Sequence, residues 1–280
     1  MSPGSPPSRA ASVPDMTSAV RGPSRPYLYD CMHAHKDYES EAGRLLDLAG
    51  HAPVRCLDIG CGTGRHAVAL VKAGATAVTG VDPDGDLVEA AAARALASGV
   101  SAATTFQIGR VEAADPGPYD LVTLLFNVVN YLPSPDALAE LFRHVATFDP
   151  RIVAFDAWAP RASGQSDITR ASRPFDCDGT RLIVDTTLRF DEAGPGSCGM
   201  QRSVRLPNED HGQVVEAVLL SVWPQEVLAR AASDAGFAVT VTTWSALLGT
   251  DHGPTDPEPL LFVCRPVEPG TSPSPTGGTT

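Results

Sequence analysis

Basic residues, long apolar runs and paired cysteine motifs are all scarce in this sequence. Its 280 residues include 21 Lys and Arg against 33 Asp and Glu, which gives a formal net charge of −12. A surface that binds a nucleic-acid backbone needs clustered basic residues to neutralise phosphates, so nucleic acid is not expected as a partner. No apolar run approaches the length of a membrane span, and a membrane partner is not expected either.

The six cysteines include no C-x-x-C pair, and we expect them to be reduced thiols in a cytoplasmic protein. Residues 1–25 are rich in Ser and Pro without an apolar core, which predicts a disordered tail and not a signal peptide. Residues 266–280 repeat this bias and predict a second tail. His33 and His35 are predicted at the surface, and since neither has partner ligands at a suitable spacing, no metal site is expected.

A strand, a glycine-rich turn and a helix can be read from residues 54–73. The apolar residues between Val54 and Ile59 suit a buried strand of a parallel sheet. Gly60, Gly62 and Gly64 follow, and they let the chain turn tightly against a bound ligand. Helical periodicity then runs to Gly74, which ends it, and residues 77–81 form the next apolar strand.

Two carboxylates flank this turn. Asp82 ends the second strand about 20 residues after the turn, where a carboxylate can accept hydrogen bonds from both hydroxyls of a ribose. The turn reads G-x-G-x-G and not G-x-G-x-x-G, so the cradle for a dinucleotide pyrophosphate is not matched. Asp58, two residues before Gly60, suits a cationic sulfonium better than an anionic pyrophosphate.

The segment Leu57–Gly64, followed by Gly80-Val81-Asp82, resembles the first two motifs of class I S-adenosylmethionine-dependent methyltransferases. The resemblance implies S-adenosylmethionine as cofactor and S-adenosylhomocysteine as product. It also implies that the glycine turn lies beneath the methionine part and the ribose, and that Asp82 binds the ribose hydroxyls. The cofactor contacts implied by position are Tyr38, Asp58, Gly60, Cys61, Gly62, Gly64, Asp82, Pro83, Arg110, Val111, Phe126 and Asn127.

Strands and helices continue to alternate after the turn. Helices are expected at 84–98 and 135–147, and strands at 103–108, after Pro118 and at 151–156. With a helix at 224–235 and strands near 237–243 and 259–265, this predicts an α/β, Rossmann-like, seven-stranded and mainly parallel sheet with helices on both faces. Ligands bind such sheets at the carboxyl ends of the strands, an edge that we expect to carry Gly60, Asp82, Gly109, Asn127 and Asp156.

The third strand departs from the family at its end. Arg110 occupies the place where many members have an acidic residue that meets the adenine amino group, and a guanidinium has only donors. Two alternatives stay open: backbone amides around Arg110 and Val111 hold the adenine, or Glu112 accepts from it.

Two segments are predicted on the methyl-acceptor side. Residues 127–132 lie where class I methyltransferases place groups beside the reacting methyl, which makes Asn130 and Tyr131 candidate catalytic residues. Residues 27–38 resemble the N-terminal lid of small-molecule N-methyltransferases, above all those acting on nucleotide-linked amino sugars and on glycine or sarcosine. There Tyr29 would contact the substrate. The alternatives are that Tyr29 and Tyr38 only pack a helix and that the asparagines only bond local backbone.

The alternation breaks after residue 158. Three β-rich segments at 181–190, 199–206 and 213–222 predict an antiparallel lid over residues 159–223, inserted after the fifth strand into a core of residues 26–158 and 224–265. The amino-sugar subgroup often carries an E-x-H pair here. Glu216 matches it, but Val218 replaces the histidine, so no role for that histidine is expected.

Methyl transfer mainly requires that nucleophile, methyl carbon and sulfur be collinear in a dry pocket. No histidine base or metal cluster is evident, which favours an amine nitrogen of a small polar natural product, such as an amino sugar, because an amine already offers a lone pair. An O- or C-methyltransferase and a non-catalytic cofactor-binding protein are alternatives, and the turn disfavours a dehydrogenase. The acceptor, the number of methyl groups transferred and the choice between monomer and homodimer are left open.

Overall fold

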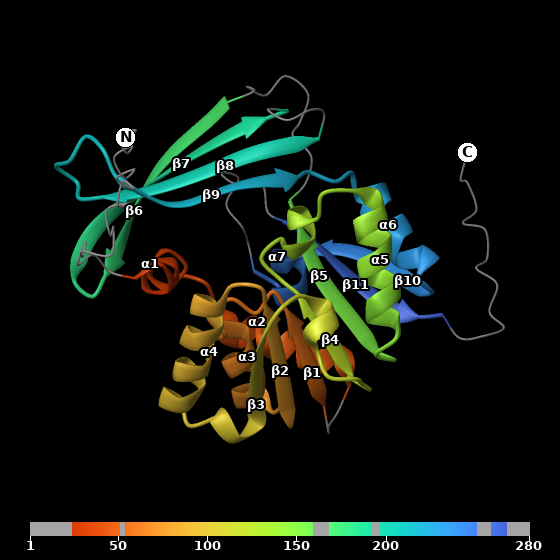
Figure 1. Ribbon diagram of the computed structural model, residues 1–280. Helices are drawn as coiled ribbons and strands as arrows, with labels where there is room; N and C mark the ends of the chain where they lie inside the picture. The colour runs from red at the N-terminus through yellow and green to blue at the C-terminus, as the bar shows by residue number, and fades with distance from the viewer. Residues whose placement is uncertain (1–23, 51–53, 159–167, 192–195, 251–258, 268–280) are drawn as a thin grey trace, which may run out of the picture.

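The computed structural model describes residues 24–50, 54–158, 168–191, 196–250 and 259–267. Apart from residues 24–25 and 266–267, the two predicted tails lie outside the described residues. The chain forms two sheets (Figure 1). The core sheet is covered by helices, and the second sheet lies above one edge of the core sheet. The predicted fold class is confirmed by this architecture.

The core sheet has seven strands in the order β10-β11-β5-β4-β1-β2-β3. The five strands from β3 to β5 in this order run parallel, whereas β11 is antiparallel to both β5 and β10. Strand β5 is buried along its whole length, as expected of a central strand with helices on both faces. The strands are β1 Arg55–Ile59, β2 Ala77–Asp82, β3 Thr104–Ile108, β4 Leu121–Leu124, β5 Ile152–Ala157, β10 Phe237–Thr243 and β11 Leu260–Pro266.

Helices cover both faces of this sheet and build two apolar cores. One face carries α2 Tyr38–Ala49, α3 Arg65–Ala73, α4 Gly85–Ala97 and α7 Trp244–Leu248, and the other carries α5 Pro135–Ala146 and α6 Gln225–Asp234. The helix ends follow local chemistry, since Ser134 caps α5 through Ala137 N and Gly74 ends α3 in the left-handed conformation. Three short 3₁₀ turns lie in the connections: η1 Ser101–Ala103, η2 Val111–Ala113 and η3 Val128–Tyr131.

The second sheet, called the lid sheet below, is antiparallel and has four strands where the sequence predicted three. They are β6 Ile168–Cys177, β7 Thr180–Phe190, β8 Ser197–Arg205 and β9 Gln213–Ser221, in that order across the sheet. Strand β6 was missed because it is an exposed edge strand, polar over most of its length and interrupted by Pro174. The inference of an antiparallel sheet after the fifth strand is nevertheless confirmed.

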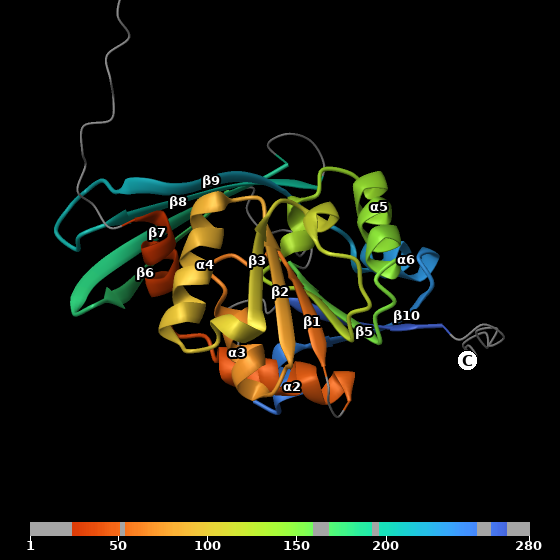
Figure 2. The ribbon, with the colours of Figure 1, turned by 60° about the horizontal axis from the view of Figure 1, so that its bottom comes forward.

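The lid sheet covers the edge of the core sheet at which the parallel strands end. Figures 1 and 2 show helix α1, Arg25–Met32, lying between this sheet and α4, and α1 contacts both β6 and α4. The N-terminal segment therefore joins the two sheets. Within the described part of the chain, no helix is both long enough and apolar enough to cross a membrane.

Gly60 and Gly43 provide a matched pair for testing how tightly the glycine turn is packed. Gly60 has φ 72°, and an added Cβ would lie 2.4 Å from Cγ2 of Val128. Gly43 lies inside α2, where an added Cβ would meet nothing within 4 Å. We expect Gly60→Ala to lower the free energy of unfolding by about 2 kcal/mol, and Gly43→Ala to raise it by roughly 0.5–1 kcal/mol. Denaturant titration of both variants checks this, and equal effects would contradict it.

Candidate active site

The glycine turn is attached to β2 by its own backbone. The amides of Gly60 and Cys61 both donate to the carbonyl of Val81, over 2.7 and 3.1 Å. A Cβ on Gly64 would lie 2.8 Å from Cβ of Ala91 in α4, whereas a Cβ on Gly62 would meet nothing within 4 Å. Close packing against protein atoms thus explains Gly60 and Gly64, and only Gly62 faces open space.

Asp82 lies where β2 meets this turn, as predicted. Its carboxylate accepts from the amides of Gly62 and Asp84, each at 2.9 Å. Burial raises the pKa of Asp82, and these two backbone hydrogen bonds oppose that shift. Since a carboxylate offers about four acceptor sites, two of them are still available for hydroxyl groups.

Asp58 is a deeply buried acid of the site. It is 2% exposed and accepts a 2.7 Å hydrogen bond from Oγ1 of Thr123. Burial raises its pKa, and the nearby His66 opposes that shift. His66 in turn bonds to the buried Glu41 at 2.8 Å, and Lys36 pairs with the same carboxylate at 2.9 Å. Several buried charged groups therefore lie beneath the turn, where an apolar core would otherwise be expected.

The loop after β4 is locally strained. Phe126 and Asn127 both have left-handed backbone, with φ 63° and 61°, which is costly for residues other than glycine. The buried carboxylate of Asp156 holds this conformation, since it accepts from the amide of Asn127 at 2.6 Å and from Nε1 of Trp244 at 3.2 Å. Oδ1 of Asn127 is buried and has no hydrogen-bond partner among the described residues.

A pocket opens between the glycine turn, the loop after β4 and the N-terminal segment. Phe126 forms one wall, with its ring stacked on Tyr38 at a centroid distance of 6.1 Å and Nζ of Lys36 at 4.3 Å from its centre. The lining contains six of the twelve expected cofactor contacts. The lining residues are Tyr29, Tyr38, Asp58, Gly60, Cys61, Gly62, Thr63, Arg65, His66, Leu125 and Phe126.

Four of the expected cofactor residues have side chains that do not face this pocket. Pro83 and Arg110 are exposed, and Val111 is buried in the core beneath η2. The Cys61 side chain is directed at Gly80, where an added Cβ would lie 2.9 Å from its sulfur, and burial raises the pKa of this thiol. Cys61 and Val111 can therefore reach a ligand through backbone atoms only.

The two candidates on η3 have different surroundings. Asn130 is fully buried, where its Nδ2 donates to the carbonyl of Ser221 at 2.7 Å and its Oδ1 accepts from the amide of Trp158 at 3.1 Å. Both ends of this amide are thus occupied in joining η3 to β9 and β5. Tyr131 is half-exposed and donates to Glu216 over 3.3 Å. Glu216 also pairs with Arg202, its partner across β8 and β9, at 2.9 Å.

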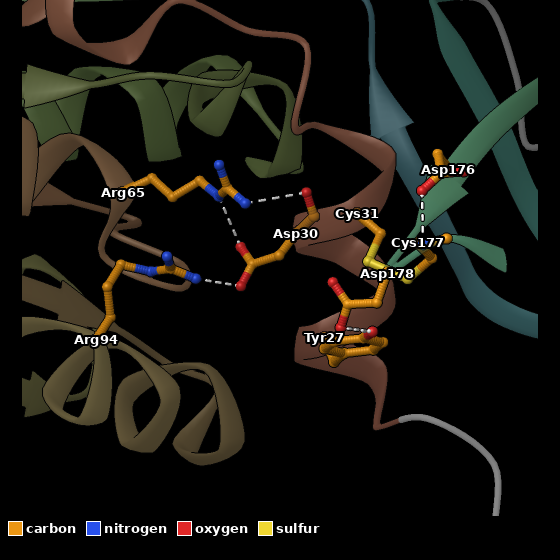
Figure 3. The surroundings of a disulfide bond; sticks show 9 residues. Tyr27, Asp30, Cys31, Arg65, Arg94, Asp176, Cys177 and Asp178 are labelled. Atoms are coloured by element: carbon orange, nitrogen blue, oxygen red, sulfur yellow. Dashed lines mark hydrogen bonds and ion pairs between the residues drawn. A yellow bond between two sulfur atoms is a disulfide. The ribbon is translucent and has the colours of Figure 1, made fainter. Parts of the chain in front are cut away.

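Asp30 was not assigned a role from the sequence, yet it holds α1 against the glycine turn. Its carboxylate accepts from Oγ1 of Thr63 at 2.6 Å and from Nε of Arg65 at 2.9 Å, and it pairs with Arg94 of α4 (Figure 3). Arg94 also donates to the carbonyl of Thr63 at 2.8 Å. The sequence shows only that an acid stands beside Tyr29. It does not show the role of Asp30, because the three partners of this carboxylate lie 33 to 64 positions away in the chain.

A disulfide joins α1 to the lid sheet, which corrects the expectation of six reduced thiols. Cys31 of α1 is bonded to Cys177 at the end of β6, next to the hydrogen bond from Tyr27 to Asp178 (Figure 3). These cysteines are 146 positions apart, so no local sequence motif predicts the disulfide. The other four cysteines are buried and are not part of a disulfide. The cytoplasmic location stays a prediction, and this bond counts against its premise, since disulfides persist mainly in oxidising compartments.

His33 also differs from expectation. It was predicted at the surface, but its ring lies against Tyr29 and Phe126, at centroid distances of 4.6 and 5.1 Å, whereas His35 is exposed. The reason is that the C-terminal end of α1 lies at the pocket, and His33 directly follows that end. No group of three or more His, Cys, Asp or Glu side chains that could hold a metal ion is found among the described residues.

Comparison with known proteins agrees with this geometry. Residues 56–147 match a family described as "Methyltransferase domain". The predicted enzyme class, an S-adenosylmethionine-dependent methyltransferase, is thereby confirmed. None of the curated protein sequences matches the chain.

Solved structures share the fold over most of the chain. An S-adenosylmethionine-dependent methyltransferase from Clostridium acetobutylicum is 14% identical, with a TM-score of 0.67 over 85% of this chain and 96% of that one. CalS10, an amino pentose methyltransferase from Micromonospora echinaspora, is 19% identical, with 0.67 over 86% and 96%. KedS8, a sugar N-methyltransferase from Streptoalloteichus, is 19% identical, with 0.64 over 93% and 100%.

The role of Asp30 can be tested without a substrate. We expect Asp30→Asn to lower the hydrogen-exchange protection of the α1 amides about tenfold, because a hydrogen bond to a charged group contributes about 1.5–3 kcal/mol. Asp47→Asn is the control, since its pair with Arg44 is largely exposed and 3.4 Å long. Unchanged exchange in α1 of Asp30→Asn would show that other contacts hold the helix.

The disulfide predicts a definite thiol count. Alkylation of the unfolded protein without reductant should label four cysteines, and alkylation after reduction should label six. The double variant Cys31→Ser, Cys177→Ser should lose about 2–4 kcal/mol of stability, because the bond closes a long loop and restricts the unfolded chain. Labelling of all six cysteines without reductant would refute the pairing.

Proposed function

We propose that the protein transfers the methyl group of S-adenosylmethionine to an amine nitrogen of a small polar natural product, such as an amino sugar. The observation that carries this proposal is the joint enclosure of one site by the core and the lid sheet. The pocket at the glycine turn is walled by Tyr29 and Phe126, and Tyr131 extends from the same rim to Glu216 of the lid sheet. An acceptor bound there would lie between the cofactor pocket and polar lid groups.

The residues present fit the cofactor. Asp82 has two free acceptor positions for the ribose hydroxyls, and the unpartnered Oδ1 of Asn127 suits the ammonium of the methionine part. Gly62 leaves space for the ligand to approach the backbone, and Tyr38 and Phe126 supply an aromatic wall. When bound, S-adenosylmethionine supplies an electrophilic methyl group on a sulfonium. The protein then has to bind, orient and dehydrate the two reactants.

The acceptor side supports a nitrogen nucleophile. A neutral amine needs no base before it attacks, and its N–H groups need acceptors, which Glu216 and the Tyr131 hydroxyl can provide. Burial raises the pKa of Tyr29 and of Tyr131, so both phenols stay protonated at neutral pH. Asn130 would act indirectly, because its two hydrogen bonds join η3 to Ser221 of the lid sheet and to Trp158, which follows β5. The printed descriptions of CalS10 and KedS8 as amino pentose and sugar N-methyltransferases agree with this proposal.

Product analysis tests the proposal directly. The purified protein and S-adenosylmethionine are incubated with a panel of nucleotide-linked amino sugars, other small amines and matching alcohols, and the products are examined by mass spectrometry. A mass gain of one or two methyl groups on amines alone is expected. Methylation restricted to alcohols or carbon acids would replace the proposal with an O- or C-methyltransferase. Binding of S-adenosylhomocysteine with no product from any acceptor would favour the non-catalytic alternative.

Asp82→Ala tests the ribose contact. We expect the variant to bind S-adenosylhomocysteine at least about 1 kcal/mol more weakly by calorimetry, because the ribose hydroxyls lose their acceptor. Asp86→Ala is the control, since Asp86 is an exposed acid in the first turn of α4. Unchanged affinity in Asp82→Ala would move the ribose site elsewhere.

A further inference from the structure

His33 has the only unpartnered side-chain nitrogen among the buried polar atoms of the described residues. Three such atoms lack a hydrogen-bond partner: His33 Nε2, Gln107 Oε1 and Asn127 Oδ1. The proposed cofactor contacts use Asn127, and Gln107 lies on β3, whereas nothing proposed so far uses His33. A buried polar atom without a partner costs free energy, so a ligand that satisfies it would bind with a gain.

The place of His33 in the fold is the junction between the cofactor pocket and the lid sheet. Its ring touches Tyr29 and Phe126, and both of these line the pocket. The charge of Arg202, on the lid sheet, favours a lower pKa of both His33 and Tyr29. A methyl acceptor must occupy this same junction, because it has to reach the cofactor from the lid side.

The surroundings keep the ring neutral. Burial lowers the pKa of His33 to about 3, and four basic side chains add to this: Arg202 of β8, Arg65 of α3, and His35 and Lys36 on the same segment. A neutral imidazole has one nitrogen that donates and one that accepts, so with the proton on Nδ1, Nε2 can accept a hydrogen bond. At neutral pH, the junction therefore contains a neutral acceptor that does not repel an approaching amine.

We propose that Nε2 of His33 accepts a hydrogen bond from the N–H of the acceptor amine and so directs the amine lone pair toward the methyl carbon. This assignment rests on the proposed function. As the nitrogen–carbon bond forms, the carbon–sulfur bond breaks and its electron pair stays on sulfur. The positive charge moves to the product ammonium, and its N–H strengthens the bond to Nε2 until the proton leaves to water with the product.

Three substitutions separate this role from packing. His33→Phe keeps a ring against Tyr29 and Phe126 but removes the acceptor nitrogen. His33→Gln keeps a side-chain hydrogen-bond acceptor. His35→Phe is the control, because it makes the same replacement at a nearby histidine that is exposed. For each variant, the affinity for S-adenosylhomocysteine is measured by calorimetry, and kcat/KM is measured with the amine that the wild-type enzyme methylates best in the panel.

We expect His33→Phe to bind S-adenosylhomocysteine within twofold of the wild type and to lose at least tenfold in kcat/KM for the amine. His33→Gln should recover part of that loss, and His35→Phe should behave as the wild type. Wild-type turnover in His33→Phe, equal losses in Phe and Gln variants, or lost S-adenosylhomocysteine binding in His33→Phe would each overturn the assignment. If the wild-type enzyme methylates no amine, the proposed function fails first, and this assignment fails with it.

Discussion

The N-terminal wall of the pocket depends on how α1 is held, and the carboxylate of Asp30 is the central contact. It joins Thr63 in the glycine turn, Arg65 of α3 and Arg94 of α4 to one turn of α1. That turn also carries Tyr29 and is followed by His33, so the same contact places the walls of the pocket. On its opposite side α1 is bonded covalently to the lid sheet. The eight-residue helix α1 therefore couples the core and the cofactor pocket to the lid sheet, in addition to the hydrogen bonds from η3 to β9.

The site also contains features that a sequence selected for stability alone would avoid. Asp58, Asp82 and Asp156 are buried acids whose pKa is raised by burial. Phe126 and Asn127 add two consecutive left-handed residues. Such local costs persist where the surroundings overdetermine them, and they gather at sites that bind or react. Here all of them lie at the carboxyl edge of the parallel strands, which is where open α/β sheets bind ligands.

Expectations from the sequence were most accurate where the deciding interaction was local. Runs of apolar residues correctly predicted the strands β1, β2 and β5. Capping residues predicted the ends of helices α3 and α5 to within one or two positions of their observed ends. Strand β6 was not predicted, because an exposed edge strand does not need alternating apolar residues. The disulfide, the partial burial of His33 and the hydrogen bonds of Asn130 were not predicted for a second reason, since their partners come from elements far away in the chain.

The sequence by itself determined the parallel core, the glycine turn with Asp58 and Asp82, and hence the class of cofactor, because strand periodicity, glycine conformation and a carboxylate at a strand end are properties of short segments. Tertiary structure alone decided which side chains meet across the pocket. Glu216 reaches Tyr131 only after the lid sheet has folded over the rim, and His33 becomes partly buried only when α1 packs between the two sheets. Side-chain contacts between distant elements depend on how those elements pack, and no local pattern encodes that packing.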